Sequence, residues 1–167
     1  MNQHKEQTQI IAALNEQIAQ EYYAFYLYLA MAEYFEEKSF IGFAHWMKIQ
    51  SNEEKTHAEK ICKYMNERGW RVHLKTIKEP PFEWTSPRQC FDEAYKHEQL
   101  VTHNINNIMN MAIEAKDYPT QIMLNWFVNE QVEEEQQLKL ILDKFELIKD
   151  STTALLFLDK ELGKRKE

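Results

Sequence analysis

Apolar residues recur at helical spacing along most of the chain. Near the start, Ile10, Leu14 and Ile18 follow one another at steps of four residues, which puts them on one face of a helix. Similar patterns predict four long helices and one short helix, over residues 6–35, 40–68, 87–115, 119–148 and 152–162. Each long helix would extend on the order of 43 Å at the standard rise per residue.

Residues with strong end preferences mark the limits of these helices. Ser39 is expected to cap the start of the second helix, and Gly69 is expected to end it. Ser86 is followed by Pro87, with Gln89 two residues later, which is typical of a helix start. The periodic segments and the residues that start or end helices therefore predict the same elements.

The connections predict how the helices pack. Residues 70–86 lack helical periodicity and contain two prolines, so we expect one long connection there. Asp117-Tyr118-Pro119 indicates a tight break, and either Asp150 or Ser151 caps the short fifth helix. Short, long and short connections between similar helices predict an all-α four-helix bundle with one long crossover and a fifth C-terminal helix, a single domain over residues 1–167.

Composition narrows the class of protein and its partners. Only 3 Gly and 4 Pro interrupt 167 residues, and 44% hydrophobic with 28% charged residues is typical of a globular chain. The net charge of −7 argues against nucleic acid and favours cations, and the basic tail Lys164-Arg165-Lys166 is too short to change this. No apolar run is long enough to span a bilayer. Cys62 and Cys90 form no disulfide framework, and the N-terminus lacks a signal-peptide pattern, so we expect a cytoplasmic protein without a membrane partner.

Acidic residues interrupt the apolar stripes near the middle of the long helices. Glu21 lies seven residues from Tyr28 and shares its face. Glu54 and His57 are three residues apart, which is about one helical turn, and Glu98 lies on the apolar stripe of the third helix. An ionised carboxylate on such a face is costly unless it is paired or binds a metal.

The fourth helix carries a denser group of acids. Glu130, Glu133 and Glu134 are spaced i, i+3 and i+4, and Gln131 lies three residues before the last of them. On the second helix, Glu53 points about 100° away from Glu54. Glu53 can therefore reach only an adjacent site, not the site that Glu54 faces.

Each of these features alone is weak evidence for a metal site. An E-x-x-H pair by itself is usually not a metal site, and a run of glutamates is usually a solvated face. Their conjunction on four helices corresponds to most of the di-iron carboxylate arrangement of four-helix bundles. Carboxylate and imidazole ligands suit iron, whereas the lack of a thiolate cluster disfavours structural zinc and iron–sulfur centres.

The chain resembles the non-haem ferritins of prokaryotes in the stretches LNEQIAQEYYAFYLY, NEEKTHAEK, YKHEQL, DYPT and NEQVEEEQ. The likeness extends over the whole chain and includes LLFLDKEL in the fifth helix. It implies a di-iron centre in which Glu54 bridges the two metals. The implied ligands come from all four long helices: Glu21, Glu54, His57, Glu98 and either Gln131 or Glu134.

The same resemblance implies further residue roles. Tyr28 matches the family tyrosine beside the centre, an electron donor, and Trp126 is a looser candidate for that role. Haem is not expected, because Lys55 stands where haem-binding relatives have Met. The implied third iron position has the ligands Glu53, Glu130, Glu133 and Glu134. The remaining histidines match no ligand position: His4, His45, His73, His97 and His103.

The function that the resemblance implies is iron storage and detoxification. A ferroxidase would oxidise Fe²⁺ to Fe³⁺ with dioxygen or peroxide and store it as mineral inside a homo-oligomeric shell of 24 subunits. The fifth helix would pack around the four-fold axes, which would give its apolar cluster, residues 155–158, a partner. Two alternatives stay open: a non-enzymatic metal-binding cage, whose known examples lack the full ligand set, and a di-iron oxygenase of an organic substrate, for which the sequence reveals no pocket.

Overall fold

A computed structural model describes residues 2–166, with side chains from residue 5 onward, so residues 1 and 167 and the side chain of His4 lie outside the described residues. Five helices and no strand are found in this part of the chain. They are α1 (Asn2–Glu37), α2 (Ile41–Glu67), α3 (Pro87–Glu114), α4 (Tyr118–Ile148) and α5 (Thr152–Leu162). The expected all-α class is confirmed, and α1 begins earlier than the apolar pattern indicated.

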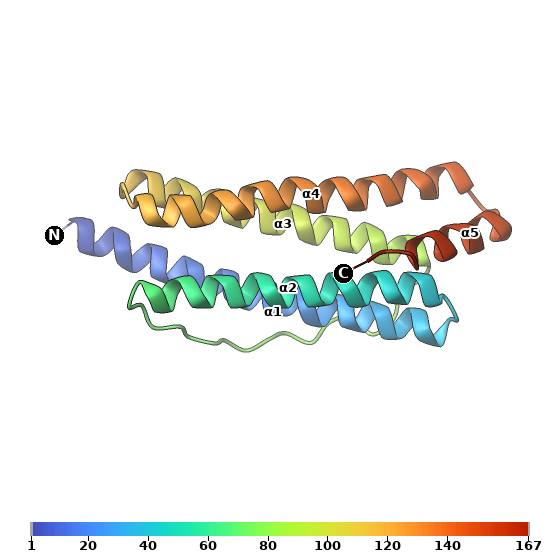
Figure 1. Ribbon diagram of the computed structural model, residues 1–167. Helices are drawn as coiled ribbons and strands as arrows, with labels where there is room; N and C mark the ends of the chain where they lie inside the picture. Colours follow the sequence, from blue (N-terminus) through green and yellow to red (C-terminus); the bar gives the residue numbers. More distant parts are fainter. Residues whose placement is uncertain (1, 167) are drawn as a thin grey trace.

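The four long helices form a bundle of two antiparallel pairs, α1 with α2 and α3 with α4 (Figure 1). The long connection between α2 and α3 carries the chain from one end of the bundle to the other, and α5 lies at the end where α4 finishes (Figure 1). None of the described helices is both long and apolar enough to cross a membrane. The long connection between α2 and α3 is the predicted single crossover. It lets each long helix present one face to a shared interior.

The turn after α1 differs from the expectation. Ser39 does not cap α2: its φ is 65°, and the N-cap position belongs to Phe40, whose side chain makes no capping bond. The backbone amides of Ser39 and Phe40 instead donate to the carbonyl oxygens of Glu36 and Phe35. The rings of Phe35 and Phe40 also pack edge to face. These are the bonds of a Schellman ending, so Ser39 closes the first helix rather than opening the second.

The other helix ends follow the sequence signals closely. Gly69 has φ 68° and ends α2 with the same bonding pattern. Ser86 accepts a hydrogen bond from the amide of Gln89 at the start of α3. Asp117 caps α4 in the same way, and Ser151 caps α5. The cap before α5 is therefore the second of the two residues that the sequence offered.

The crossover is tied down along its length. The amide of His73 donates to Asn15 Oδ1 at 2.6 Å, and the hydroxyl of Tyr34 donates to the carbonyl oxygen of Trp84 at 2.9 Å. Both anchoring side chains belong to α1. The connection is thus held against the first helix rather than left free.

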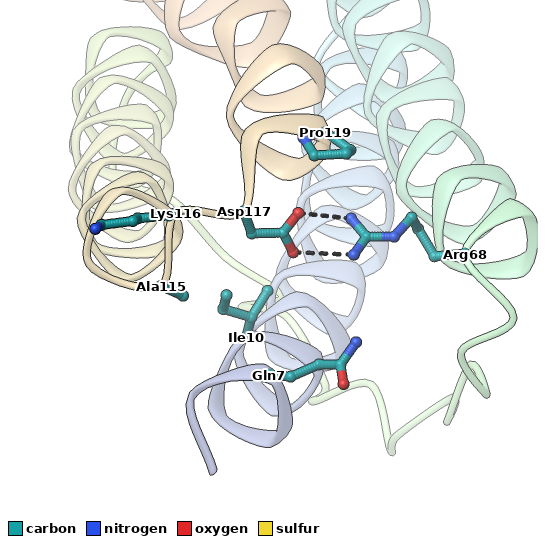
Figure 2. A pocket seen from close by; sticks show the side chains of 7 residues that line it. All are labelled: Gln7, Ile10, Arg68, Ala115, Lys116, Asp117 and Pro119. Carbon is teal, nitrogen blue, oxygen red and sulfur yellow. Dashed lines mark hydrogen bonds and ion pairs between the residues drawn. The ribbon is translucent and has the colours of Figure 1, made fainter. Parts of the chain in front are cut away.

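An ion pair joins the helices at one end of the bundle. Arg68 donates from Nη1 and Nη2 to Asp117 Oδ1 and Oδ2, at 2.8 and 3.1 Å (Figure 2). The guanidinium also lies 4.2 Å from the ring centroid of Trp70. Because Asp117 caps α4 and Arg68 ends α2, this pair couples two helix ends.

The apolar core is divided into two clusters along the bundle. Toward α5, one cluster joins side chains from residues 24–35, 43–47, 90–94 and 138–145. Toward the opposite end, the other joins residues 10–18, 61–70, 101–112 and 124–127. Buried polar side chains fill the intervening layer on every long helix: Gln17, Glu21, Gln50, Ser51, Glu54, His57, His97, Glu98, Gln131 and Glu134. The sequence therefore builds a polar layer between two apolar halves.

The short helix α5 packs directly on α2 because Gly42 has no side chain. A Cβ at Gly42 would lie 1.7 Å from the carbonyl oxygen of Asp159. The side chain of Asp159 in turn accepts a hydrogen bond from the amide of Phe43 at 2.8 Å. The first turn of α2 is thus capped by the fifth helix, not by a residue of its own turn.

The apolar cluster of α5 is only partly satisfied within the chain. Leu158 and Leu162 are buried in the core, whereas Leu156 and Phe157 are 56% and 69% exposed. Part of this cluster thus has a partner inside the subunit, which the sequence interpretation did not include.

Candidate metal centre

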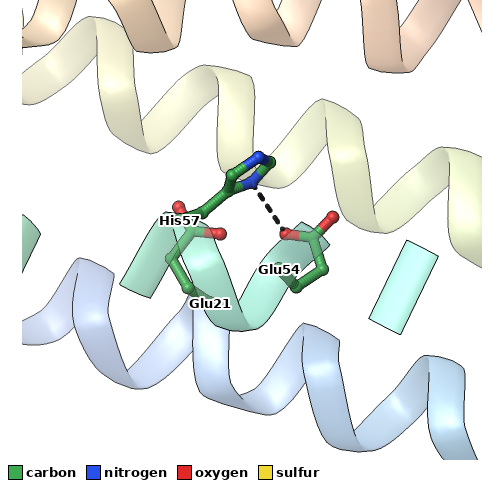
Figure 3. A group of neighbouring side chains, drawn as sticks. All are labelled: Glu21, Glu54 and His57. Carbon is green, nitrogen blue, oxygen red and sulfur yellow. Dashed lines mark ion pairs between the residues drawn. The ribbon is translucent and has the colours of Figure 1, made fainter. Parts of the chain in front are cut away.

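Three side chains with metal-ligand atoms converge in the polar layer. Glu21 comes from α1, and Glu54 and His57 come from adjacent turns of α2; all three are buried. One ligand atom from each lies within 4.8 Å of the others. Figure 3 shows the two carboxylates and the imidazole ring turned toward one another, with His57 Nδ1 3.3 Å from Glu54 Oε2. The spacing expected from the sequence does bring these residues together.

The hydrogen bonds of this group are incomplete. Among the described residues, four buried side-chain nitrogen or oxygen atoms have no hydrogen-bond partner, and three of them are Glu21 Oε2, Glu54 Oε2 and His57 Nδ1. A buried polar atom left unpaired costs about 1–3 kcal/mol. Two anionic oxygens and an imidazole nitrogen facing one space are the donors that a divalent cation takes. The group therefore fits a bound metal better than it fits a role in stabilising the fold.

The charges of this group are poorly matched without a cation. Burial raises the pKa of Glu21 well above its ordinary value, and the nearby charge of Glu54 raises it further. Burial likewise raises the pKa of Glu54, with added contributions from the charges of Glu98 and Glu134. A divalent cation between these oxygens would favour their ionised forms. Without a metal, protonation is the alternative way to balance these carboxylates, and a bound cation would replace those protons.

Glu98 of α3 is held by two donors. The hydroxyl of Tyr28 donates to its Oε1, and the amide of Gln131 donates to its Oε2 at 3.1 Å. Burial raises the pKa of Glu98 to about 7, even though both hydrogen bonds act to lower it. Burial, followed by the charge of Glu98, raises the pKa of Tyr28 well above its ordinary value. Tyr28 therefore stays protonated and keeps its hydrogen on Glu98.

A chain of donors fixes the orientation of Gln131. The hydroxyl of Thr102 donates to Glu135 Oε1 at 2.5 Å, and Gln131 Nε2 lies 3.3 Å from Thr102 Oγ1. An ionised carboxylate only accepts, so the single hydroxyl hydrogen of Thr102 is used by Glu135 and its oxygen accepts from Gln131. The amide nitrogen of Gln131 therefore faces α3 and donates to Glu98. Gln131 acts here as a donor to a candidate ligand.

Glu134 is connected to the centre through a second amide. Gln50 Nε2 donates to Glu54 Oε1 at 3.0 Å and to Glu134 Oε2 at 2.6 Å. Burial, followed by the charge of Glu98, raises the pKa of Glu134 to about 8. One glutamine on α2 thus holds a carboxylate from its own helix and one from α4.

A second group of ligand atoms shares the same histidine. His57, Glu130 and Glu134 also offer three ligand atoms within 4.8 Å of one another. His57 Nε2 lies 3.9 Å from Glu130 Oε1, on the opposite side of the ring from Glu54. A neutral imidazole has one lone pair, so metal binding at Nδ1 would put the hydrogen on Nε2, facing Glu130. The ring thus links the two groups.

The other predicted positions lie farther from the convergence. Glu53 is half-buried and pairs with Arg165, whose Nη2 lies 2.5 Å from Glu53 Oε2. Glu133 is exposed. Neither belongs to a group of three ligand residues in the described part of the chain, so their metal roles stay predictions. The ring of Trp126 packs edge to face on His57, with centroids 5.4 Å apart.

Sequence reasoning missed the amides that hold the carboxylates. Gln17 donates to Glu21 at 2.8 Å, and Gln50 donates to Glu54. Each glutamine lies four residues before its glutamate, a helical spacing that the sequence does offer as a signal. No comparable signal marks Arg165, which lies more than 100 residues away from its partners in the chain.

The chain is similar to characterised families over most of its length. A family profile described as "Ferritin-like domain" matches residues 11–148. A bacterial non-heme ferritin of Staphylococcus epidermidis is 41% identical over 157 residues, covering 94% of this chain and 95% of that protein. One from Staphylococcus aureus is 37% identical over 156 residues, covering 93% and 94%.

Solved structures show the same likeness in three dimensions. A structure described as a novel open pore ferritin from the hyperthermophilic archaeon Archaeoglobus fulgidus is 46% identical, with a TM-score of 0.93 over 95% of this chain and 96% of that one. A closed form of the Archaeoglobus fulgidus ferritin, engineered by site-directed mutagenesis, has a TM-score of 0.92 at the same identity and coverage.

Proposed function

The chain belongs to the ferritin family, and from that premise we propose how its own residues bind and oxidise iron. Ferritins store iron, and oxidation of Fe²⁺ to Fe³⁺ is typical of the family, so the chain is an iron-storage oxidoreductase. The proposal concerns which residues carry this activity. Its main support is the set of three unpaired ligand atoms, on Glu21, Glu54 and His57, that face one another in the buried polar layer.

We assign two Fe²⁺ positions to the polar layer. Glu21 and His57 hold the first, Glu98 holds the second, and Glu54 lies between them as the bridge. Glu134 is the better candidate than Gln131 for the second position, because Glu134 offers a carboxylate oxygen while Gln131 donates its amide to Glu98. Four carboxylates and one neutral imidazole would balance two divalent cations.

The ligand types explain why the site favours oxidation. Anionic oxygens stabilise Fe³⁺ more than Fe²⁺, and two adjacent Fe²⁺ ions supply two electrons to one dioxygen or peroxide. Tyr28 donates its hydrogen bond to Glu98 and so lies in contact with a proposed ligand. This contact supports the role of Tyr28 as an electron donor, which stays a proposal.

A third iron position remains part of the proposal. Glu130 and Glu134 lie near His57, on the far side of the ring from Glu54. Glu53 and Glu133 would complete that position after their side chains turn toward it. Its proposed task is to take iron away from the pair toward the mineral store.

Dioxygen uptake after Fe²⁺ addition tests the assignment of the bridge. Glu54→Ala should slow initial uptake by the apo-protein at least tenfold, because both iron positions lose a ligand. Glu59→Ala is the matched control, since Glu59 is an exposed glutamate of the same helix, and its only ion pair among the described residues is with Lys55 at the surface. Equal uptake curves for Glu54→Ala and the unchanged protein would refute the assignment.

We further propose that the subunits form a closed shell of 24 copies. Storage of mineral needs an enclosed cavity, and one bundle does not enclose one. The exposed side chains of Leu156 and Phe157 on α5 support a subunit contact there. Sedimentation of the purified chain measures this: a dimer or monomer as the largest particle would contradict the shell, whereas Leu156→Glu with Phe157→Glu should shift a shell to smaller species.

A further inference from the structure

The C-terminal segment after α5 lies along α2 and is fixed there. Gly163 approaches Gly42 so closely that a Cβ on Gly163 would meet the Cα of Gly42 at 3.0 Å. His45 Nε2 lies 2.9 Å from the backbone carbonyl oxygen of Arg165. Because a carbonyl oxygen can only accept, the imidazole ring of His45 is the donor. Figure 1 shows the end of the chain returning beside the middle of α2. Arg165 therefore reaches the turns of α2 that lie next to the metal centre.

The side chain of Arg165 is held at a defined position on α2. Its Nη1 donates to Gln50 Oε1 at 2.8 Å, and its Nη2 donates to Glu53 Oε2 at 2.5 Å. The guanidinium also lies 4.4 Å from the ring centroid of Trp46. These three partners are spaced i, i+4 and i+7, so they lie on one face of the helix. The Arg165 side chain is only 13% exposed, so the cation is held rather than solvated.

Hydrogen bonds connect Arg165 to the proposed iron ligands. A guanidinium has no acceptor, so Gln50 must turn its amide oxygen toward Arg165. Both amide hydrogens of Gln50 then point toward Glu54 and Glu134, to which the structure shows them donating. Arg165 thus neutralises Glu53 directly and fixes, through Gln50, the amide that holds two carboxylates of the centre.

We propose that Arg165 is a built-in counter-cation of the third iron position, and that a metal ion binds Glu53 there only as the guanidinium leaves it. The carboxylate of Glu53 cannot fully serve both cations, and a positive charge beside a cation site lowers the affinity of that site. The inference rests on the proposed third position, because it concerns Glu53 as a ligand. It makes the C-terminal segment a competitor of iron at that position.

Titration of the apo-protein with Zn²⁺, which is not oxidised, tests this competition without measuring activity. In isothermal titration calorimetry, Arg165→Gln should tighten the weakest Zn²⁺ class about tenfold, because the competing charge is gone. Lys164→Gln is the matched control: it removes the same charge from an exposed neighbour in the same segment, and it should change that class less than about twofold. Arg165→Lys, which keeps the charge, should lie between.

Glu53→Gln separates this inference from the proposed third position. If Glu53→Gln weakens the weakest class while Arg165→Gln leaves that class unchanged or weaker, the competition is refuted and the third position stands. If Glu53→Gln leaves every class unchanged, Glu53 is not a ligand, and the competition falls together with the assignment of Glu53 to the third position. In the Glu53→Gln background, Arg165→Gln should add no tightening. Thermal unfolding gives a second readout: Arg165→Gln should lower the melting temperature of the apo-protein, and saturating Zn²⁺ should reduce that difference.

Discussion

Two clusters of carboxylates, one partly buried and one fully buried, lie in this bundle, and their charges are balanced in opposite ways. At the end of the bundle, Asp117 faces Arg68, and the hydrogen bonds from Arg68 and Thr120 lower the pKa of Asp117 although burial acts to raise it. In the middle, Glu21 and Glu54 pair with no lysine or arginine among the described residues, and burial raises their pKa values.

The difference matches the roles assigned above. The carboxylate of Asp117 has its own cation and links two helix ends, whereas Glu21 and Glu54 have none, as expected for ligands of the proposed iron site. Glu53 on α2 is an intermediate case: it pairs with Arg165, unlike Glu54, so a metal ion at Glu53 would first have to displace the guanidinium. The two clusters therefore differ both in burial and in whether the chain itself supplies the balancing cation.

Replacing the bridge should have the largest effect of any single change. Glu54→Gln should lower the initial rate of Fe²⁺ oxidation by at least about tenfold, as expected for Glu54→Ala, because a neutral amide cannot bridge two cations. The apo-protein should unfold at the same temperature or a higher one, since the variant replaces a buried carboxyl, whose ionisation burial disfavours, with an amide of nearly the same shape. Stopped-flow absorbance and calorimetry measure the two quantities. A variant that lost activity and also unfolded early would mean that Glu54 supports the fold.

Replacing the cation at the bundle end should have the opposite profile. Arg68→Met should lower the free energy of unfolding by roughly 2 kcal/mol, because Asp117 is left partly buried without its charged donor. The Zn²⁺ affinity of the central site should change less than about twofold. Denaturant unfolding and calorimetry give both values. A large loss of Zn²⁺ affinity would show that the two clusters are coupled rather than independent.

The two clusters should also respond differently to pH. Glu98 and Glu134 have pKa values raised from 4.5 to about 7 and about 8, so between pH 4.5 and 8 the folded apo-protein keeps protons that the unfolded chain releases. Its free energy of unfolding should therefore fall as pH rises through this window. Asp117, with its lowered pKa, loses its contribution only in stronger acid, as pH falls below its ordinary value of 3.8.

Melting temperatures of the apo-protein at pH 5.5 and pH 8 measure this slope. Saturating Zn²⁺ should reverse it, because metal binding favours the ionised carboxylates. The double variant Glu98→Gln with Glu134→Gln should reduce the slope and leave the contribution of Glu21 and Glu54. An apo-protein that became more stable from pH 5.5 to pH 8 would contradict the raised pKa values.

Much of this contrast is present in the sequence, but not all of it. Periodicity predicted the long helices, and it placed Glu21, Glu54 and Glu98 on inward faces, because a helix fixes which residues share a face; their metal roles stay predictions. Ser39 misled because serine satisfies a cap only with an extended backbone, and here it takes a positive φ. The position of Arg165 on α2 depends on the close contact of α5 at Gly42, a tertiary contact that no local sequence pattern encodes.

The smallest expected effect concerns the surface end of the donor chain to Glu98. Glu135 accepts the hydroxyl hydrogen of Thr102, which leaves the Thr102 oxygen to accept from Gln131 and keeps the amide nitrogen of Gln131 toward Glu98. Thr102→Val removes both links and should lower the initial rate of Fe²⁺ oxidation by about twofold to fivefold. Thr102→Ser keeps the hydroxyl and should restore the rate. If valine and serine behave alike, the hydroxyl does not orient Gln131, and the other two acceptors of that amide, both on Glu98, suffice to hold it.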